Sequence, residues 1–423
     1  MRLECPVEAG TPRLGYRYDP KVAGSVARVV SPPFDQYNQE MQATAYKLSP
    51  YHFVRLILPR DENPHLAAAN TLGQWLAAGV LVPEAAPAIY PYSQAYRDPR
   101  GTPHVRHGFL ALLRLTPLEG GPIYPHERTM PRTLADRLEL MRATRADFGP
   151  IFITFPDDDG EVTRLLKDAH DGKPVISVPD SDGNRHDVWV QTDTAWQQKL
   201  VDLMQPVDGV IADGHHRYKA ALQYADEVEA AGGGESPARF KLVALFPAFA
   251  DNLTVFPVHR VVEAWPQGAD AEKFFGVARK DHLRLENLQD AVAANPNTLG
   301  VFTRKGGIEV WTHRDDAPVV WDSEPSENYR KLPAAVFEAS VLRGLMGMSQ
   351  NRIALKDGLQ YVRHVNEARQ LIWKGFDRAF FLPPTPLDAI IAAARAGELM
   401  PQKSTYFYPK LLSGLVSYLH DRF

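Results

Sequence analysis

The stretch VIADGHHRYKAA, residues 210–221, carries the sharpest structural signal in the chain. A strand should end at Asp213, because the apolar run stops there and Gly214 permits a tight turn. From Arg217 onward the pattern indicates a helix, and Ala220-Ala221 are small enough to pack closely on a sheet. The stretch therefore predicts a strand, a tight turn and a helix in succession.

The same turn has the groups of a phosphate cradle. Backbone amides at a helix start bind anions, and Gly214 lets a ligand approach the backbone. Arg217 and a protonated His215 or His216 would add positive charge, while Asp213 could hold a metal ion or accept a proton. The alternative is a structural turn in which the histidines cap the helix or pair with acidic neighbours.

Short apolar runs and helical patterns alternate along the chain on both sides of this turn. The runs bounded by Pro, Gly, Asp or Asn predict strands at residues 53–58, 109–115, 151–154, 188–191, 207–212 and 241–246. Helical patterns occupy residues 66–78, 134–143, 195–204 and 217–231. Strands interleaved with helices predict an α/β or α+β fold, a mixed sheet with helical cover.

A second series of elements follows WPQG at 265–268. Residues 298–303 and 308–312 predict a hairpin around Gly306-Gly307, and helices are expected near 334–346 and 387–396. We therefore expect an α/β catalytic or binding domain over residues 1–265 and a smaller α+β domain over 266–423. The chain end carries site-like residues and should return to the cleft of the first domain.

Composition excludes several classes of protein. The 423 residues are 44% hydrophobic and 23% charged, which is ordinary for a globular chain. A formal charge of −4 disfavours a nucleic-acid or anionic-membrane partner. No apolar run is long enough to cross a bilayer and no signal peptide is evident, so we expect a cytoplasmic location. One cysteine, Cys5, excludes an internal disulfide and a four-cysteine zinc site.

Standard catalytic motifs are missing from the sequence. There is no P-loop, no GxGxxG dinucleotide fingerprint and no GxSxG nucleophile elbow. His126-Glu127 begins like the zinc motif HExxH, but Met130 replaces the second histidine and Pro131 would break the helix. Magnesium held by carboxylates and phosphates fits the remaining groups better than zinc.

The loop at residues 126–128 is rich in reactive side chains. His126, Glu127 and Arg128 offer an imidazole, a carboxylate and a guanidinium just before an arginine-rich helix that ends near Arg145. These arginines form either a solvated helix face or an anion site for a nucleotide or phosphorylated substrate. We expect His126, Glu127 and Arg128 to converge with the 213–217 turn.

Asp35 and two lysines complete the set of candidates. Asp35 follows Pro32-Pro33 in a stiff loop that suits an acid/base group or a metal ligand, although an ordinary turn would look the same. Lys403 and Lys410 flank the aromatic run 406–408, which suits either phosphate contact with base stacking or a hydrophobic core. If the site is shared, both lysines should lie within about 25 Å of Gly214.

The DGHHR turn resembles the ParB and sulfiredoxin superfamily, whose phosphate-binding turn has the form Gly-x-x-Arg followed by a helix with small residues. Gly214, Arg217 and Ala221 match it. ParB-like free serine kinases look closer still, and the resemblance implies that Asp213 stands where their catalytic aspartate stands. His215 occupies the place of the sulfiredoxin cysteine, which excludes reduction of sulfinic acids through a thiol.

A second resemblance covers nearly the whole chain. Six blocks, at residues 31–35, 49–56, 126–129, 142–152, 213–218 and 400–410, look like the successive blocks of a family catalogued as domain of unknown function one-thousand-fifteen. Phe34 and Gln36 depart mildly from the usual continuation around Asp35. This resemblance implies a fold and a set of site candidates more than a reaction.

Together these patterns predict an enzyme with a ParB-like core that binds a nucleotide, ATP or ADP, or a phosphorylated small molecule. The reaction expected is Mg²⁺-dependent phosphoryl transfer to or from a small hydroxylated substrate such as serine. Asp213 or Asp35 would act as base, and His216 and Arg217 would stabilise the phosphoryl charge. Glu127 is a further catalytic candidate. The other candidate contacts are Gly214, His215, Tyr218, His126, Arg128, Arg145, Lys403 and Lys410.

Two other functions are compatible with parts of this pattern. A non-catalytic nucleotide sensor would keep the cradle without productive geometry. A DNA-binding ParB relative is disfavoured by the charge and by the lack of a basic recognition helix. The identity of the substrate, the direction of transfer and the oligomeric state stay open.

Overall fold

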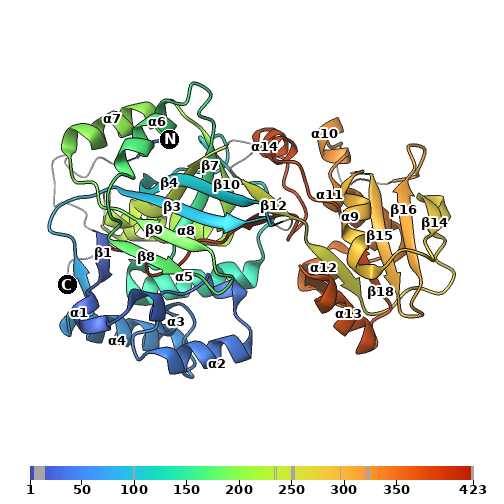
Figure 1. Cartoon of the computed structure of the whole chain (residues 1–423), viewed down its shortest axis with the longest axis horizontal. Helices are drawn as coiled ribbons and strands as arrows, with labels where there is room; N and C mark the ends of the chain where they lie inside the picture. The colour runs from blue at the N-terminus through green and yellow to red at the C-terminus, as the bar shows by residue number, and fades with distance from the viewer. Residues whose placement is uncertain are drawn as a thin grey trace. The chain divides into compact units, whose positions relative to one another are not determined.

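The computed structural model describes residues 1–420 apart from 4–14, 99–100, 233, 235, 249–252, 296, 320 and 322–323 (Figure 1). Cys5 lies outside the described residues. The chain forms two compact units. Unit 1 comprises Met1–Tyr124, Thr129–Thr254 and Pro409–Phe423, and unit 2 comprises Pro125–Arg128 and Val255–Tyr408. The chain thus passes into unit 2 after Thr254, about ten residues before 265, and its last residues belong to unit 1.

Unit 1 is built on a mixed eight-stranded sheet, which confirms the expected fold class. Strand β11 runs parallel to β7 and antiparallel to β4, and β10 runs antiparallel to β7. The strand order is β5 (Ile123–Tyr124), β10 (Gly209–Asp213), β7 (Ile151–Phe155), β11 (Phe240–Pro247), β4 (Pro103–Arg114), β3 (Tyr90–Arg97), β9 (Arg185–Val188) and β8 (Ile176–Pro179).

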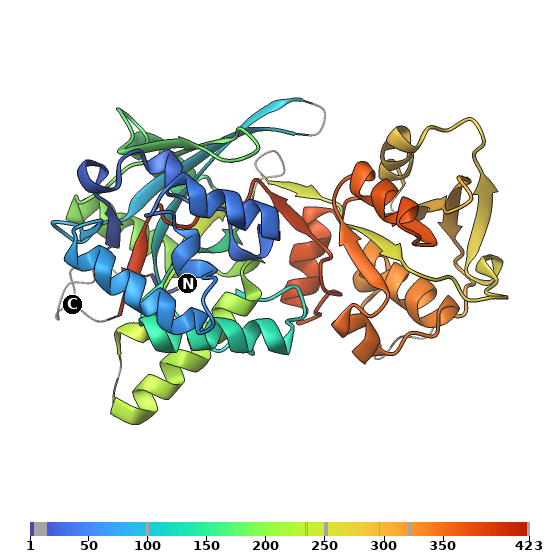
Figure 2. The same ribbon diagram turned by 90° about the horizontal axis from the view of Figure 1, so that it is seen from below.

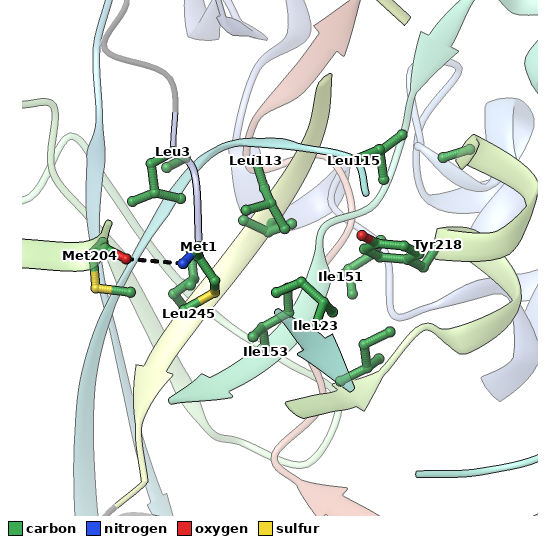
Figure 3. Packing of buried hydrophobic residues seen from close by; sticks show 14 of the residues in the cluster. Met1, Leu3, Leu113, Leu115, Ile123, Ile151, Ile153, Met204, Tyr218 and Leu245 are labelled. Carbon is green, nitrogen blue, oxygen red and sulfur yellow. Dashed lines mark hydrogen bonds between the residues drawn. The ribbon is translucent and has the colours of Figure 1, made fainter. Parts of the chain in front are cut away.

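Helices pack on this sheet through small and apolar side chains. Ala220 and Ala221 of α8 (His215–Gly232) are fully buried in one cluster with Ile151 and Ile153 of β7, as the sequence predicts. Figure 3 shows this cluster, which also receives Met1. Helix α5 (Pro131–Thr144) packs against α8 and α4 (Pro64–Ala77), and Figure 2 shows α5 in teal beside α8 in yellow-green. Helices α6 (Glu161–Ala169) and α7 (Thr194–Met204) contribute buried side chains to the same cluster.

A second, four-stranded sheet in unit 1 joins segments from both ends of the chain. Its order is β2 (Leu81–Pro83), β1 (Gly15–Tyr18), β20 (Ser417–Leu419) and β6 (Ala146–Asp147). The C-terminal β20 pairs with β1 and β6, so it holds residues 409–416 close to the loop after α5. Helices α1 (Pro20–Ala23), α2 (Gln39–Leu48) and α3 (Val54–Ile57) lie in the same N-terminal part.

Two predicted strands of unit 1 need correction. The prediction of a strand at residues 53–58 is wrong, because Val54–Ile57 form the helix α3. Phe53, Val54, Leu56 and Ile57 are all buried, and a short run of buried apolar residues has no period that separates strand from helix. The strand expected at 188–191 lies earlier, at Arg185–Val188, and Gln191 makes only an isolated bridge with Ile89.

Unit 2 contains a six-stranded antiparallel sheet with the order β14 (Phe275–Arg279), β16 (Ile308–His313), β15 (Thr298–Thr303), β18 (Arg378–Phe381), β13 (His259–Val262) and β17 (Leu359–Val362). The predicted hairpin of β15 and β16 is confirmed. Short strands β12 (Thr254–Phe256) and β19 (Tyr406–Tyr408) also pair.

The helices of unit 2 include an uncommon one. Where the sequence predicts a helix over 334–346, α11 (Pro333–Val336) continues as a π-helix over Phe337–Leu345. The others are α9 (Leu288–Ala293), α10 (Glu327–Arg330), α12 (Gln350–Leu355), α13 (Val365–Trp373) and α14 (Leu387–Arg395). In the part of the chain that the structure describes, no helix combines the length and the hydropathy needed to span a bilayer.

Candidate functional site

The turn after β10 has the predicted strand–turn–helix geometry. Strand β10 ends at Asp213, and Gly214 adopts a φ of 102°, a value that a side chain would disfavour. Helix α8 begins at His215, two residues earlier than expected, because the backbone turns entirely at Gly214. The first hydrogen bond of the helix runs from the Tyr218 amide to the Gly214 carbonyl at 2.9 Å. The amides of residues 215–217 therefore form the positive end of the helix.

Asp213 lies between two cationic side chains. Its Oδ2 accepts a hydrogen bond from Nη2 of Arg217 at 2.6 Å, and its Oδ1 accepts one from Nζ of Lys410 at 2.5 Å. All three side chains are at least four-fifths buried. One carboxylate shared by two cations leaves this trio with a charge of +1. A partly buried positive charge at a helix start is an environment that attracts anions.

Buried polar groups fix both cations in place. Arg217 donates through Nη1 to the Pro150 carbonyl at 2.5 Å. The segment that carries Lys410 is held by the sheet: Arg106 donates to the Pro409 carbonyl at 2.5 Å, and Gln94 donates to the Lys410 carbonyl at 3.0 Å. Arg106 is completely buried, and burial lowers its pKa to about 10. The two cations are thus held by buried parts of the fold as well as by Asp213.

A small pocket of about 50 Å³ opens beside Arg217. Its volume suits one phosphate-sized group and is too small for a nucleoside. Its walls come from six parts of unit 1, which are the loop at 33–34, the end of α3, helix α5 with the segment that follows it, the start of α8, the start of β11, and the C-terminal segment. The lining residues are Pro33, Phe34, Ile57, Arg137, Leu140, Met141, Ala146, Asp147, Phe148, Gly149, Arg217, Lys241 and Ser413.

Two further cations line this pocket, each with a carboxylate partner. Nζ of Lys241 lies 2.9 Å from Asp147 Oδ1, and both side chains are buried. Burial lowers the pKa of Lys241, Asp147 raises it, and Arg217 lowers it again. Arg137 pairs with Asp136 and donates to the Ile57 carbonyl at 3.0 Å. Burial lowers the pKa of Arg137 most, and Arg217 contributes in the same direction. The pocket therefore gathers three cationic side chains within electrostatic reach of one another.

Asp35 lies in the 3₁₀ turn Phe34–Gln36, next to the pocket-lining Phe34. Its side chain is exposed, and its charge raises the pKa of Arg137. The loop is anchored to the C-terminal segment by two backbone hydrogen bonds between Ser31 and Ser413, at 3.0 and 2.7 Å. Asp35 is therefore held beside the rim of the pocket.

The side chains of His215, His216 and Tyr218 have different surroundings and contacts. Met130 donates its amide to Nε2 of His216 at 2.7 Å, so this nitrogen is unprotonated and a neutral imidazole carries its proton on Nδ1. His215 is buried. Tyr218 is buried in the core (Figure 3), and its hydroxyl accepts from the Thr116 amide and donates to the Thr116 carbonyl. Tyr218 thus holds the helix to the core and its hydroxyl is committed there.

The arginines of α5 and its C-terminal end are expected to form either a solvated helix face or an anion site, and the structure shows both exposed and pocket-lining ones. Arg142 is exposed and pairs with Glu139 and Glu227, as a solvated helix face would. Arg145 is exposed at the end of α5 with a φ of 48°, and its carbonyl accepts from the His420 amide. Arg137, in contrast, lines the pocket.

The remaining candidates belong to unit 2. His126 is buried and its Nε2 lies 2.8 Å from the Thr405 hydroxyl, while Arg128 pairs with Glu338 at 3.0 Å. The backbone of Glu127 forms an isolated parallel β-bridge with Met400, and the Lys403 carbonyl accepts a hydrogen bond from Arg260. The expected convergence of His126, Glu127, Arg128 and Lys403 with the 213–217 turn would join the two units, and it stays a prediction.

Several residues that build this site are not among the candidates that the sequence indicates. Lys241 opens the apolar strand segment KLVALF, and a lysine there could have signalled a buried ion pair. No local pattern pointed to its partner Asp147, nor to Arg106 in the middle of β4. For a metal ion, no cluster of three or more His, Cys, Asp or Glu side chains exists among the described residues. A Mg²⁺ ion bound mainly through substrate phosphates needs only one or two protein carboxylates, which Asp213 or Asp35 could supply.

Comparison with known proteins places this chain in context. The profile of a family described as protein of unknown function (DUF1015) matches residues 11–335. Five of the six sequence blocks fall inside this range, and block 400–410 lies beyond it. No curated protein matches the chain.

Several solved structures are similar to it. A free serine kinase variant in complex with AMP aligns at 10% identity with a TM-score of 0.37, covering 70% of this chain and 87% of that chain. SbnI from Staphylococcus aureus, truncated at its C-terminus, aligns at 14% identity with a TM-score of 0.35, covering 72% and 85%. A conserved hypothetical protein from Pyrococcus furiosus aligns at 12% identity with a TM-score of 0.33, covering 71% and 92%.

Proposed function

This chain belongs to the family described as protein of unknown function (DUF1015), and we propose that it is a nucleotide- or phosphate-dependent phosphotransferase acting on a small hydroxylated molecule such as serine. The observation that carries the proposal is the sharing of Asp213 by Arg217 and Lys410 at the start of α8. This arrangement gives an anionic group two cations and a set of helix amides in one place.

The size and charge of the pocket beside Arg217 favour a phosphate as its occupant. A volume of about 50 Å³ admits one phosphoryl group, so the rest of a nucleotide would lie outside it. Arg217 and Lys410 would then exchange contacts with Asp213 for contacts with phosphate oxygens. Arg137 and Lys241 also line the pocket, each paired with a carboxylate, and they would add to the positive field around the phosphate.

The proposed chemistry is transfer of a phosphoryl group from a nucleotide to a hydroxyl. The acceptor oxygen forms a bond to phosphorus, the bond from phosphorus to the bridging oxygen of the nucleotide breaks, and the hydroxyl proton passes to a carboxylate. Asp213 stands within reach of the cradle, and Asp35 at the rim is the other candidate base. His216 would donate from Nδ1 as a neutral imidazole rather than as a cation. Mg²⁺ held by a carboxylate and the phosphates would supply charge neutralisation.

A non-catalytic nucleotide sensor is the second candidate. The observation that favours it is that both oxygens of Asp213 already accept hydrogen bonds from cations. An aspartate that served only to orient Arg217 and Lys410 would have this geometry. Binding without turnover would then be its activity.

The two candidates are separated by incubating the purified chain with ATP, ADP or CTP, with Mg²⁺, and with a metabolite pool that includes serine. The phosphotransferase should release a new phosphorylated product, and Asp213→Asn should abolish turnover while keeping much of the nucleotide affinity. The sensor should show thermal stabilisation by the nucleotide and no product. Absence of both stabilisation and product would reject both functions. Arg142→Ala is the matched control, because Arg142 is an exposed arginine whose partners lie outside the pocket.

A further inference from the structure

Unit 2 contains a π-helix of nine residues, Phe337–Leu345. The amide of Met346, just beyond its end, donates to the Val341 carbonyl at 2.9 Å, which is the five-residue spacing of a π-helix. Fewer than about 1% of residues in globular proteins adopt this conformation, and short π segments inside helices frequently mark functional sites. The sequence of this segment, FEASVLRGL, contains no Pro that would force the change.

The five-residue spacing changes which side chains share a face. Glu338 and Arg343 are five positions apart. In an α-helix, at about 100° per residue, they would point about 140° away from each other. In a π-helix, residues five apart lie on successive turns. Both residues line one pocket of unit 2, as this geometry requires.

This pocket is larger than the one beside Arg217. It has a volume of about 320 Å³, enough for a molecule of the size of an amino acid or somewhat larger. Four of its side chains are charged, two of each sign, namely Arg128, Arg343, Glu338 and Glu398, and the wall between them is largely apolar or aromatic. The full lining is Arg128, Trp321, Pro325, Tyr329, Ala335, Glu338, Arg343, Gly397, Glu398, Leu399 and Pro401.

The contacts in the pocket hold its charges at fixed places. Glu338 is only 4% exposed and accepts from Nη1 of Arg128 at 3.0 Å. Glu398 accepts from both the amide and the hydroxyl of Ser326, which fixes it at the start of α10. Tyr329 stands edge-on to Trp321 and donates its hydroxyl to the Leu399 carbonyl at 3.2 Å. Taking a glutamate out of water costs free energy that an ion pair with one arginine does not always recover, so the buried Glu338–Arg128 pair is weak evidence of a purely stabilising role.

We propose that this pocket of unit 2 binds a small zwitterion with an apolar side chain, in which a carboxylate is held by Arg343 and Arg128 and an ammonium group is held by Glu338 or Glu398. The balance of two positive and two negative side chains complements a ligand of zero net charge that carries both signs. A purely anionic ligand would face the two glutamates, and a purely cationic one would face the two arginines. Trp321, Pro325 and Leu399 offer the surface for the apolar part.

This proposal does not depend on the phosphotransferase, because it rests on residues of unit 2 alone. Its test is titration of the full-length chain with each of the twenty protein amino acids, followed calorimetrically and by tryptophan fluorescence. We expect at least one amino acid with an apolar side chain to bind. The matching amine and the matching carboxylic acid, each with only one charge, should bind at least tenfold more weakly.

Two variants tie the binding to this pocket. Arg343→Ala should weaken binding about tenfold to a hundredfold, because a charge-assisted contact to the carboxylate is lost. Trp321→Phe should remove the fluorescence change while the calorimetric signal remains. Arg352→Ala is the control, since Arg352 is an exposed arginine of helix α12 that pairs with Asp357 and lies outside the pocket.

The proposal is overturned if no amino acid binds at about 10 mM to the folded chain. It is also overturned if the single-charge analogues bind as tightly as the zwitterion, or if a well-folded Arg343→Ala protein keeps the affinity of the parent. A melting curve for each variant establishes that it is folded.

Discussion

Replacing Arg217 with Ala removes the side chain that links β10, the pocket and the segment before β7. The change deletes hydrogen bonds of 2.6 Å to Asp213 and 2.5 Å to the Pro150 carbonyl, both from a guanidinium that is 14% exposed. Hydrogen bonds of charged groups contribute about 1.5–3 kcal/mol each, but Asp213 keeps its contact with Lys410 and is not left unpaired. We therefore expect the free energy of unfolding to fall by about 2–4 kcal/mol and the Tm of unit 1 by about 4–7 °C.

The same change should weaken binding of ADP about tenfold to a hundredfold, because one of two cations is lost while Lys410 and the helix amides remain. Calorimetric titration below the lowered Tm measures this separately from stability. The control, Arg142→Ala, should change the unfolding free energy by less than about 1 kcal/mol and leave the affinity for ADP unchanged. A folded Arg217→Ala protein that binds ADP as tightly as the parent would refute the phosphate cradle and leave Arg217 a structural residue.

Three further changes test the surroundings of the cradle. Lys410→Met should lower the affinity for ADP about tenfold, since it removes the second cation from Asp213; an unchanged titration curve would exclude Lys410 from the site. Lys241→Met should lower the free energy of unfolding, measured in urea, by about 3–5 kcal/mol, because the Asp147 carboxylate is left buried and without its cation. Adding Asp147→Leu should recover most of this loss. Equal stability of the single and the double variant would contradict the reasoning. Burial lowers the pKa of His52 from 6.5 to about 4, so the unfolded chain takes up a proton between these values that the folded chain does not. Stability should therefore be lost as the pH falls from about 6.5 to 4, by at most about 3 kcal/mol, and His52→Asn should reduce this loss; urea unfolding curves with the same pH dependence in both proteins would count against it.

Local structure around the turn could be predicted because each residue there acts on its neighbours. The end of β10 at Asp213, the turn at Gly214 and the burial of Ala220 and Ala221 all follow from residue type and position. The mistake at residues 53–58 has the same origin. Four of those six residues are buried, so the apolar pattern alone did not distinguish a strand from the helix α3.

Partners that are distant in sequence were harder to predict. Lys410 reaches Asp213 across 197 positions, and the sequence indicates a shared site for the two residues but not their direct contact. Lys241 lies on β11 and Asp147 on β6, and these strands belong to different sheets of unit 1. No residue pattern predicts that the two side chains meet. The π-helix was likewise hidden, because the apolar residues over 334–346 indicate a helix without fixing its hydrogen-bond spacing.

A crystal structure of the full chain with ADP and Mg²⁺ tests the central proposal most directly. We expect a phosphate of ADP beside the start of α8, within about 3.2 Å of Arg217 and Lys410 side-chain nitrogens, with both cations at least partly withdrawn from Asp213. ADP bound elsewhere, or bound with its phosphates turned away while Asp213, Arg217 and Lys410 keep their mutual contacts, would contradict it.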